Sequence, residues 1–173
     1  QKAILSIILA SVFIILFIAW SFRTIPKPYA SWKFGVSAVI ALVHDAFVLL
    51  GLFSLFGHYF HVEIDSLFVT AVLTVIGFSV HDTIVVFDRI RENLIKHPKT
   101  SFTQIVDYSI TETLNRSLST SLTVTVTLTA LLLFGGDTIR WFIVALLLGI
   151  ISGTYSSIFN AAPLLVLWES KQK

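Results

Sequence analysis

The chain has 173 residues, of which 55% are hydrophobic and 13% are charged, and it contains no cysteine and no methionine. Its mean hydropathy of +0.88 excludes a water-soluble globular domain. The lack of cysteine excludes disulfides, iron–sulfur clusters and thiolate zinc sites. A formal net charge of +2, with no run rich in Lys and Arg, offers no arm that would bind nucleic acid. We therefore expect an all-α integral membrane protein.

Five stretches are apolar for long enough to cross the membrane, since about 30 Å of hydrocarbon takes roughly 20 helical residues. They are residues 3–22, 34–56, 66–88, 117–135 and 141–168. The connections between them are too short to form a soluble domain. The sequence therefore predicts one transmembrane domain of five helices over residues 1–173.

Residues 101–116, ahead of the fourth span, are predicted to form a helix of their own. They open with Ser101-Phe102-Thr103-Gln104, which has the spacing of a capping box. Apolar residues then recur on one face, namely Phe102, Ile105, Val106, Ile110 and Leu114. Such an amphipathic helix either lies at the cytoplasmic interface or packs on the bundle.

Lys and Arg predict the orientation, because the cytoplasmic side of a membrane protein retains them. All but two of the twelve fall in the first connection, the third connection and the tail: Arg23, Lys27, Lys33, Arg89, Arg91, Lys96, Lys99, Arg116, Lys171 and Lys173. Only Lys2 and Arg140 lie on the other side. The chain is thus expected to start outside and to end in the cytoplasm. A start outside at Gln1, without a signal-peptide pattern, leads us to expect a fragment that lacks an upstream span.

Two aspartates lie within the predicted spans, each in a Val-His-Asp tripeptide that ends at Asp45 or Asp82. An ionised carboxylate in hydrocarbon costs a few kcal/mol, so each needs a physical reason. Asp82 lies about six residues, or roughly 9 Å of helix rise, inside the cytoplasmic end of its span. Arg116 opens the next span from the same side, and its long side chain can extend inward to pair with Asp82.

This predicted pair would suit a proton site. Desolvation favours the neutral acid while Arg116 favours the carboxylate, so a small movement or the entry of water can tip the balance. Protonation of Asp82 would loosen the contact and bias two helix arrangements, which is how an ion gradient becomes motion. The alternative is a static ion pair that fixes the helix register. Asp45 has no evident basic partner, so it is either always protonated or meets a second subunit.

Other chemistry is weakly indicated. His44 and His81 adjoin the aspartates, but neighbouring helical residues point about 100° apart, so we expect no metal site and no cofactor. Phosphate-loop, H-E-x-x-H and G-x-S-x-G motifs are absent. An intramembrane aspartyl protease would need a Gly-x-Gly-Asp setting that neither aspartate has. We expect no enzyme.

Hydroxyl and small side chains dominate the last two spans. Eight hydroxyl residues between Ser117 and Thr129 either line a wet path or bond to their own helix. Gly149-x-x-x-Gly153-x-x-x-Ser157 predicts close helix approach, and Pro163 predicts a kink or the end of the regular helix.

Residues 77–92, which contain Val80-His81-Asp82-Thr83, resemble the signature of SecF-type members of the SecD/SecF family of bacterial and archaeal protein export. Further matches occur in order along the whole chain: His44-Asp45, Asn115-Arg116-Ser117, Phe134-Gly135-Gly136, and Gly153-Thr154-Tyr155-Ser156-Ser157 followed by Pro163. The resemblance implies membership of the resistance-nodulation-division superfamily and correspondence to spans two to six of six. It also implies that the five helices form half of a SecD/SecF bundle. The first span and the extracytoplasmic domain that follows it in the family would then be absent.

The resemblance also implies a function in the cytoplasmic (inner) membrane. With SecD as partner, the family uses the proton motive force, or sodium in some organisms, to complete preprotein translocation through the SecYEG channel after SecA has acted. The family's relay aspartate falls on Asp82 and its essential arginine on Arg116. Residues that could assist the relay are Asp45, His81, Thr83, Asn115 and Asp137.

Two residues depart from the family pattern: the first leaves the coupling ion open, and the second keeps the usual hydroxyl group. His81 stands where Asn is more usual, and Ser117 stands where Thr is more usual. The alternatives are a drug or lipid transporter of the same superfamily and a passive structural subunit of the translocon.

Overall fold

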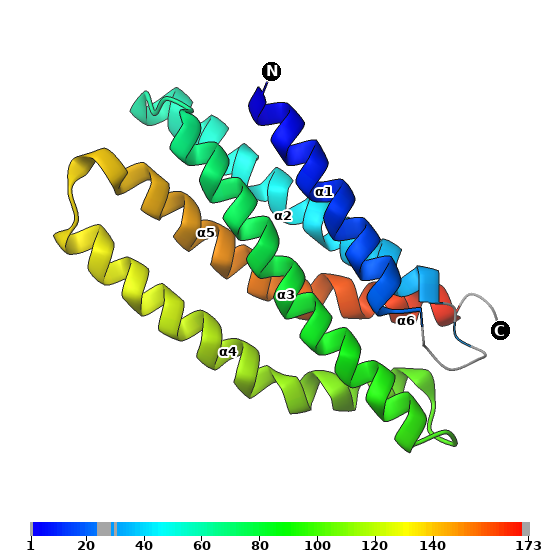
Figure 1. The fold of residues 1–173 in the computed structure, drawn as a ribbon. Helices are drawn as coiled ribbons and strands as arrows, with labels where there is room; N and C mark the ends of the chain where they lie inside the picture. Colours follow the sequence, from blue (N-terminus) through cyan, green and yellow to red (C-terminus); the bar gives the residue numbers. More distant parts are fainter. Residues whose placement is uncertain (1, 24–28, 30, 171–173) are drawn as a thin grey trace.

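The computed structural model describes residues 2–23, 29 and 31–170, and these residues form helices and connecting turns without a β-strand. The helices are α1 (Lys2–Ser21), α2 (Ser31–Phe60), α3 (Ser66–Lys96), α4 (Phe102–Phe134), α5 (Arg140–Ser156) and α6 (Ala162–Ser170). A 3-10 turn, η1 (Asp137–Ile139), precedes α5, and a π-helical segment, η2 (Ser157–Ala161), joins α5 to α6. Figure 1 shows them as one elongated bundle.

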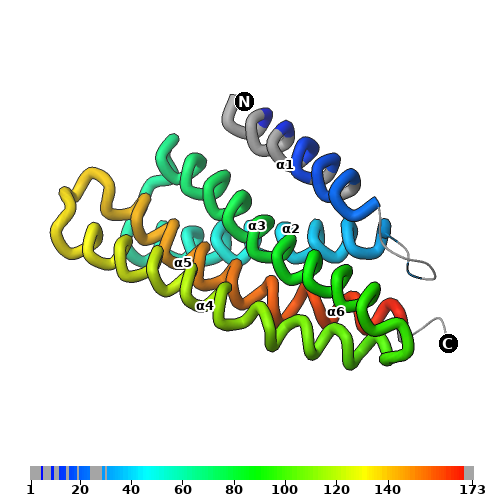
Figure 2. Tube along the Cα trace, turned by 60° about the horizontal axis from the view of Figure 1, so that its bottom comes forward, coloured from blue at the N-terminus to red at the C-terminus, as the bar shows by residue number. Residues whose placement is uncertain are grey.

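Helix α3 lies at the centre of the bundle. It contacts α1, α2, α4, α5 and η2, and its buried residues cover about half of its circumference. Helices α2 and α4 run antiparallel to α3, while α5 runs parallel to it (Figure 1 and Figure 2). Asp82 on α3 is therefore placed among helices from both directions.

Four segments of the described residues are long and apolar enough to cross a membrane: Ser31–Phe60, Ser66–Lys96, Phe102–Phe134 and Asp137–Glu169. They contain the second to fifth predicted spans. The first predicted span coincides with α1, which is a helix but is not one of these four, so the count of five spans stays a prediction. Lys27, Lys171 and Lys173, which the orientation argument used, lie outside the described residues.

The predicted helix over residues 101–116 is the first part of α4, which runs without interruption into the fourth span. Ser101 is its N-cap, and its hydroxyl accepts a hydrogen bond from the Gln104 backbone amide at 3.4 Å. Ile105 and Val106 on the predicted apolar face are buried in the protein core. Of the two alternatives, the structure therefore has the face packed on the bundle.

The small residues of α5 let it approach α3 closely, as the sequence predicts. A Cβ atom at Gly149 would collide with the side chain of Val75, and one at Gly153 would lie 3.1 Å from the Cβ atom of Ser79. The regular helix ends at Ser156, and the π-helical segment precedes Pro163. The predicted irregularity thus takes the form of a π-bulge, which is common where a helix carries a functional site.

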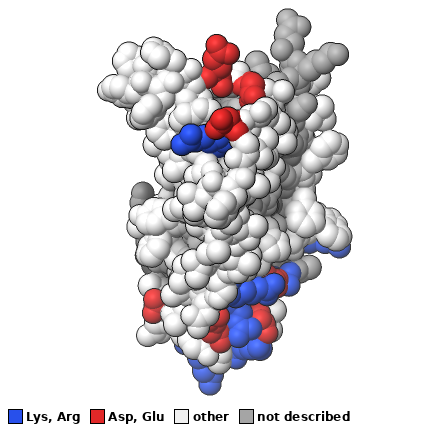
Figure 3. All heavy atoms as spheres, turned by 90° about the vertical axis from the view of Figure 1, so that its left-hand side faces the viewer, with Lys and Arg blue, Asp and Glu red and all other residues white. Residues whose placement is uncertain are grey.

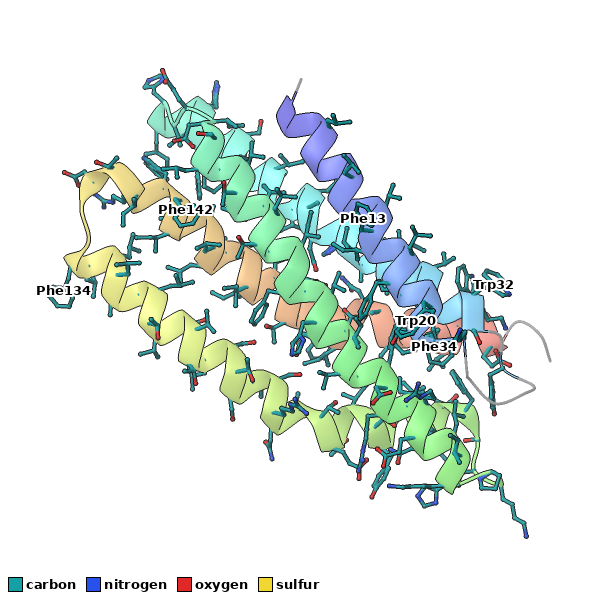
Figure 4. All side chains as sticks on the ribbon, in the orientation of Figure 1. Phe13, Trp20, Trp32, Phe34, Phe134 and Phe142 are labelled. Carbon is teal, nitrogen blue, oxygen red and sulfur yellow. The ribbon has the colours of Figure 1, made fainter. Side chains whose placement is uncertain are left out.

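Charged and aromatic side chains gather at the two ends of the bundle. On the face shown in Figure 3, a wide band without Lys, Arg, Asp or Glu separates the charged ends. Trp20 and Trp32 lie together at one end, and Phe134 points away from α4 at the other (Figure 4). Trp32 also packs against Trp168, with ring centroids 5.5 Å apart. An apolar band between aromatic ends is the pattern of a membrane-spanning bundle.

Candidate functional site

A layer of buried polar side chains crosses the apolar middle of the bundle. The members come from α2, α3, α4, α5 and η2: Asp45, Ser79, Asp82, Thr83, Ser117, Ser121, Thr154, Ser156 and Ser157. Polar groups inside a membrane are costly and face the bundle interior or one another. This layer contains both predicted aspartates and is the candidate functional site.

Asp82 is held by α4. Its Oδ1 atom accepts a hydrogen bond of 2.6 Å from the hydroxyl of Ser117. Its Oδ2 atom is buried and has no hydrogen-bond partner within the described part of the chain. A buried carboxyl oxygen without a partner costs about 1–3 kcal/mol, so this half of the group is poised to accept another contact.

Arg116 is the residue before Ser117, and its side chain is exposed. It lines a cleft of about 610 Å³ between α3 and α4, together with Asp88, Glu92 and Glu112. Across residues 2–23, 29 and 31–170, no ion pair joins Asp82 to Arg116. The predicted ion pair of Asp82 with Arg116 is therefore not formed in this structure. The neighbouring residue Ser117 contacts the aspartate instead, and Arg116 faces the cleft.

The cleft is bordered by a charged network between the C-terminal part of α3 and the N-terminal part of α4. Arg89 binds Glu112 through two nitrogens, at 2.6 and 2.8 Å, and also binds Glu92 at 2.5 Å. The amide of Asn93 donates to Ser109 and to Glu112, each at 2.9 Å. A planar guanidinium held by two carboxylates fixes the relative position of two helices. The network therefore anchors α4 just outside the Asp82–Ser117 contact.

Asp45 lies in a second polar centre. It is fully buried, and its Oδ2 atom accepts hydrogen bonds from Ser79 of α3 and, at 2.7 Å, from Ser156 of α5. The Nδ1 atom of His44 lies 3.2 Å from its Oδ1 atom. Three helices thus meet at one carboxyl group. The sequence shows no basic partner for Asp45, because none of these groups is a Lys or Arg side chain.

Hydroxyl groups connect the two centres. Ser157 donates to the backbone carbonyl of Ser79 at 3.3 Å, and its hydroxyl lies 2.8 Å from that of Thr83. Ser121 of α4 and Thr154 of α5 also share a hydrogen bond, with 2.5 Å between their oxygens. Thr83, which was predicted to assist the relay, therefore belongs to the layer. The contacts cross from α5 and η2 to α3 and α4, so they tie the bundle together at this depth.

Three other residues that were predicted to assist the relay lie outside the buried polar layer. His81 and Asn115 are exposed beside Asp82 and Arg116, and Asp137 is exposed in η1 at the opposite end of α4. Among the hydroxyls of the fourth span, Thr120, Thr123, Thr127 and Thr129 each donate to a carbonyl of their own helix. Only Ser117 and Ser121 of that span are buried.

Ser79 and Ser156 were not among the predicted site residues. A signal for them was present, because Ser79 precedes Asp82 by one helical turn and Ser156 ends the stripe of small residues that packs on α3. Within the described residues, no group of three or more His, Asp or Glu side chains could hold a metal ion.

Comparison with known proteins places this arrangement in a family. Residues 1–171 match the family described as "Protein export membrane protein SecD/SecF, C-terminal". The SecF protein translocase subunit of Thermobaculum terrenum is 57% identical over 171 residues, which make up 99% of this chain and 53% of that protein. The SecF subunit of Anaerolinea thermophila is 48% identical over 98% of this chain and 54% of its own length.

The fold agrees with that of a solved relative. A crystal structure of SecDF in its super-membrane-facing form superposes with a TM-score of 0.83 at 37% identity, over 94% of this chain and 20% of that one. The chain spans about half the length of the SecF proteins it matches. On sequence and structure together, the chain belongs to the SecD/SecF family of protein-export membrane proteins, on its SecF side.

Proposed function

We propose that this chain is the membrane half of a SecF-type subunit that works with SecD, in the cytoplasmic membrane, to drive preprotein translocation through SecYEG with the proton motive force. Sodium is the alternative coupling ion. In this proposal the chain crosses the membrane five times, starts outside, ends in the cytoplasm, and catalyses no covalent chemistry. The relatives named SecF translocase subunits and the SecDF structure support the export role.

The observation that carries the proposal is the half-satisfied carboxyl group of Asp82. One oxygen binds Ser117, and the other is buried without a partner among the described residues. A group in that state can exist as a neutral acid, held by the hydroxyl, or as a carboxylate that attracts a guanidinium. Arg116 directly precedes Ser117 on α4, and none of the ion pairs among the described residues involves it. The same helix thus carries a partner for each form.

A movement of α4 relative to α3 follows from this exchange of partners at Asp82. Ser117 and Arg116 point in directions about 100° apart on α4, so exchanging one for the other against Asp82 requires α4 to shift or turn relative to α3. Each proton that Asp82 takes up or releases would bias the two positions. One elementary charge that crosses about 100 mV supplies roughly 2.3 kcal/mol for such a change. Transport of this kind needs two positions of one helix pair, not a large rearrangement.

The test is preprotein export in cells whose full-length protein carries Asp82→Asn or Arg116→Lys. Expression and co-purification with SecD are measured alongside, so that loss of assembly is recognised. Asp107→Asn is the matched control, because Asp107 lies on α4, is exposed, and belongs neither to the polar layer nor to the cleft that Arg116 lines. We expect the first two variants to lose export while assembled and the control to keep it.

Normal export with Asp82→Asn would overturn the relay. Asp82 and Arg116 would then be structural residues, as in a passive subunit of the translocon. A transporter of drugs or lipids is the third candidate; it would show normal preprotein export and lose resistance or lipid transport instead.

A further inference from the structure

We propose that Asp45 is a second proton-binding site of this protein, loaded through His44 from a groove on the outer surface of the bundle. The inference rests on the proposed function in one respect, that the polar layer carries ions. It adds a route of access and a carboxyl group that the Asp82 relay does not need. The argument follows from what surrounds Asp45 and from where His44 is exposed.

The surroundings of Asp45 leave one group that can exchange a proton with it. The side chains that face its carboxyl group are His44 from α2, Ser79 from α3 and Ser156 from α5. Of these, only His44 has an imidazole ring, whose two nitrogens can take up and release a proton. The two hydroxyls bind Oδ2, and the imidazole Nδ1 atom lies 3.2 Å from Oδ1. Hydroxyl donors stabilise the carboxylate, and the same oxygens serve as acceptors when the acid is protonated.

His44 joins this buried group to the surface. Its side chain is 43% exposed, whereas that of Asp45 is 0% exposed. The imidazole lines a groove of about 340 Å³ between α2 and the η2–α6 segment. The amide of Asn160 lies 3.5 Å from the same imidazole nitrogen, and the rest of the lining is apolar. A polar pair in an otherwise apolar groove of a membrane-spanning bundle is costly unless water or ions reach it.

The proton step is balanced within the two side chains. With the proton of neutral His44 on Nδ1, the imidazole takes up a second proton at Nε2 from a hydronium ion in the groove, which becomes a water molecule. The Nδ1 proton then moves to Oδ1 of Asp45, which becomes a neutral carboxylic acid, and His44 returns to its neutral form. The reverse sequence releases the proton. No other titratable side chain lines the groove in the described residues.

The π-bulge couples this site to Asp82. Ser156, which binds Asp45, is followed by Ser157, which contacts Thr83 and the Ser79 carbonyl on α3. Asp82 is the residue before Thr83, and its helix also supplies Ser79 to Asp45. A change of charge at Asp45 therefore acts on the junction of α5 and η2 and on the turn of α3 that carries Asp82. A π-bulge can shift without breaking the helix on either side.

Infrared difference spectroscopy tests whether Asp45 takes up a proton. The full-length protein, assembled with SecD in lipid vesicles, is titrated between about pH 5 and 9, where a histidine-linked site responds. We expect a protonated-carboxyl band that Asp45→Asn abolishes and that Asp82→Asn retains. After a pH jump, the band should appear about tenfold more slowly in His44→Gln, because the relaying base is lost. His58→Gln, at the exposed end of α2, is the matched control.

A second measurement tests the groove, and it uses the natural absence of cysteine. Leu164→Cys places a thiol in the groove, and Leu50→Cys places one on the exposed outer face of α2. A water-soluble maleimide should label the first faster than the second, because thiolates form only where water reaches. Equal, slow labelling would show a dry groove and overturn the route.

The outcomes separate this inference from the proposed function. Absence of an Asp45-dependent band, with export still lost in Asp82→Asn, overturns the second site and leaves the Asp82 relay standing. An Asp45 band together with normal export in Asp82→Asn overturns the relay at Asp82 and leaves Asp45 as a proton-binding site. An Asp45 band with unchanged kinetics in His44→Gln overturns the role of His44.

Discussion

A single hydroxyl group holds Asp82 in this structure, and that contact is open to a precise chemical test. Ser117 is 2% exposed, and its hydroxyl is 2.6 Å from the carboxyl oxygen. Thr and Val have the same shape and differ in the hydroxyl group, so Ser117→Thr keeps the contact and Ser117→Val removes it. Loss of the donor leaves both carboxyl oxygens without a partner, at a cost of about 1–3 kcal/mol.

We expect Ser117→Thr to export preprotein at the normal rate and Ser117→Val to export about tenfold more slowly, which corresponds to about 1.4 kcal/mol. The rate is measured in inverted membrane vesicles at a fixed proton motive force. The pair Ser119→Thr and Ser119→Val serves as control, since Ser119 lies on the same helix and is exposed. If both Ser117 variants behaved alike, the hydroxyl would have no part in the relay.

At this scale the sequence identifies the charged groups better than their contacts. Asp45 and Asp82 stand out because an intramembrane carboxylate is costly, and depth along the helix follows from 1.5 Å of rise per residue. Rotation about the helix axis is harder to predict, because consecutive residues differ by about 100°. The sequence therefore brings α4 to Asp82 at the correct depth, but it cannot decide between Arg116 and Ser117 as the group in contact.

At the scale of helices, the close packing of α5 on α3 rests on Gly149. A Cβ atom at this position would overlap three side-chain atoms of Val75. We expect Gly149→Ala to destabilise the protein by about 1–3 kcal/mol, the usual cost of overpacking. Gly77→Ala is the matched control, because Gly77 lies within α3 and a Cβ atom there meets nothing within 4 Å.

The measurement is thermal unfolding of the full-length protein in detergent, with the Val75→Ala and Gly149→Ala double variant completing a mutant cycle. Trimming Val75 should recover part of the stability that Gly149→Ala loses. Additive losses in the double variant would mean that the two residues do not meet. Export is expected to fall with the single variant, since the polar layer lies directly below this contact.

Helix boundaries show where hydropathy falls short. The predicted third span ends at residue 88, yet α3 continues to Lys96 and reaches about 46 Å at 1.5 Å per residue. Hydropathy marks the hydrocarbon, whereas the helix continues as long as its backbone hydrogen bonds and caps allow. For the same reason, residues 102–116 and the fourth predicted span form one continuous helix, α4. Pro163 signalled an irregularity, but the π-helical form depends on packing of Ser156 and Ser157 against α2 and α3.

At the scale of the whole molecule, the charge distribution predicts how the bundle sits in the membrane. The described basic residues at one end are Arg23, Lys33, Arg89, Arg91, Lys96, Lys99 and Arg116, and those at the other end are Lys2 and Arg140. A cytoplasmic leaflet with anionic lipid attracts the basic end, by about 1 kcal/mol for each Lys or Arg near the surface. The charged cleft beside Asp82 would then open to the cytoplasm, and the α2–α3 connection would face outside.

Single cysteines introduced at the two ends test this orientation. Glu63→Cys lies in the α2–α3 connection and Lys99→Cys in the α3–α4 connection, and both positions are exposed. A membrane-impermeant maleimide should label Glu63→Cys in intact spheroplasts and Lys99→Cys only in inverted vesicles, because the basic connection stays in the cytoplasm. Detergent-solubilised protein, in which both thiols react, is the control for reactivity. The opposite pattern would place Asp82 near the outer surface, and protons driven inward would then reach it before they reach Asp45.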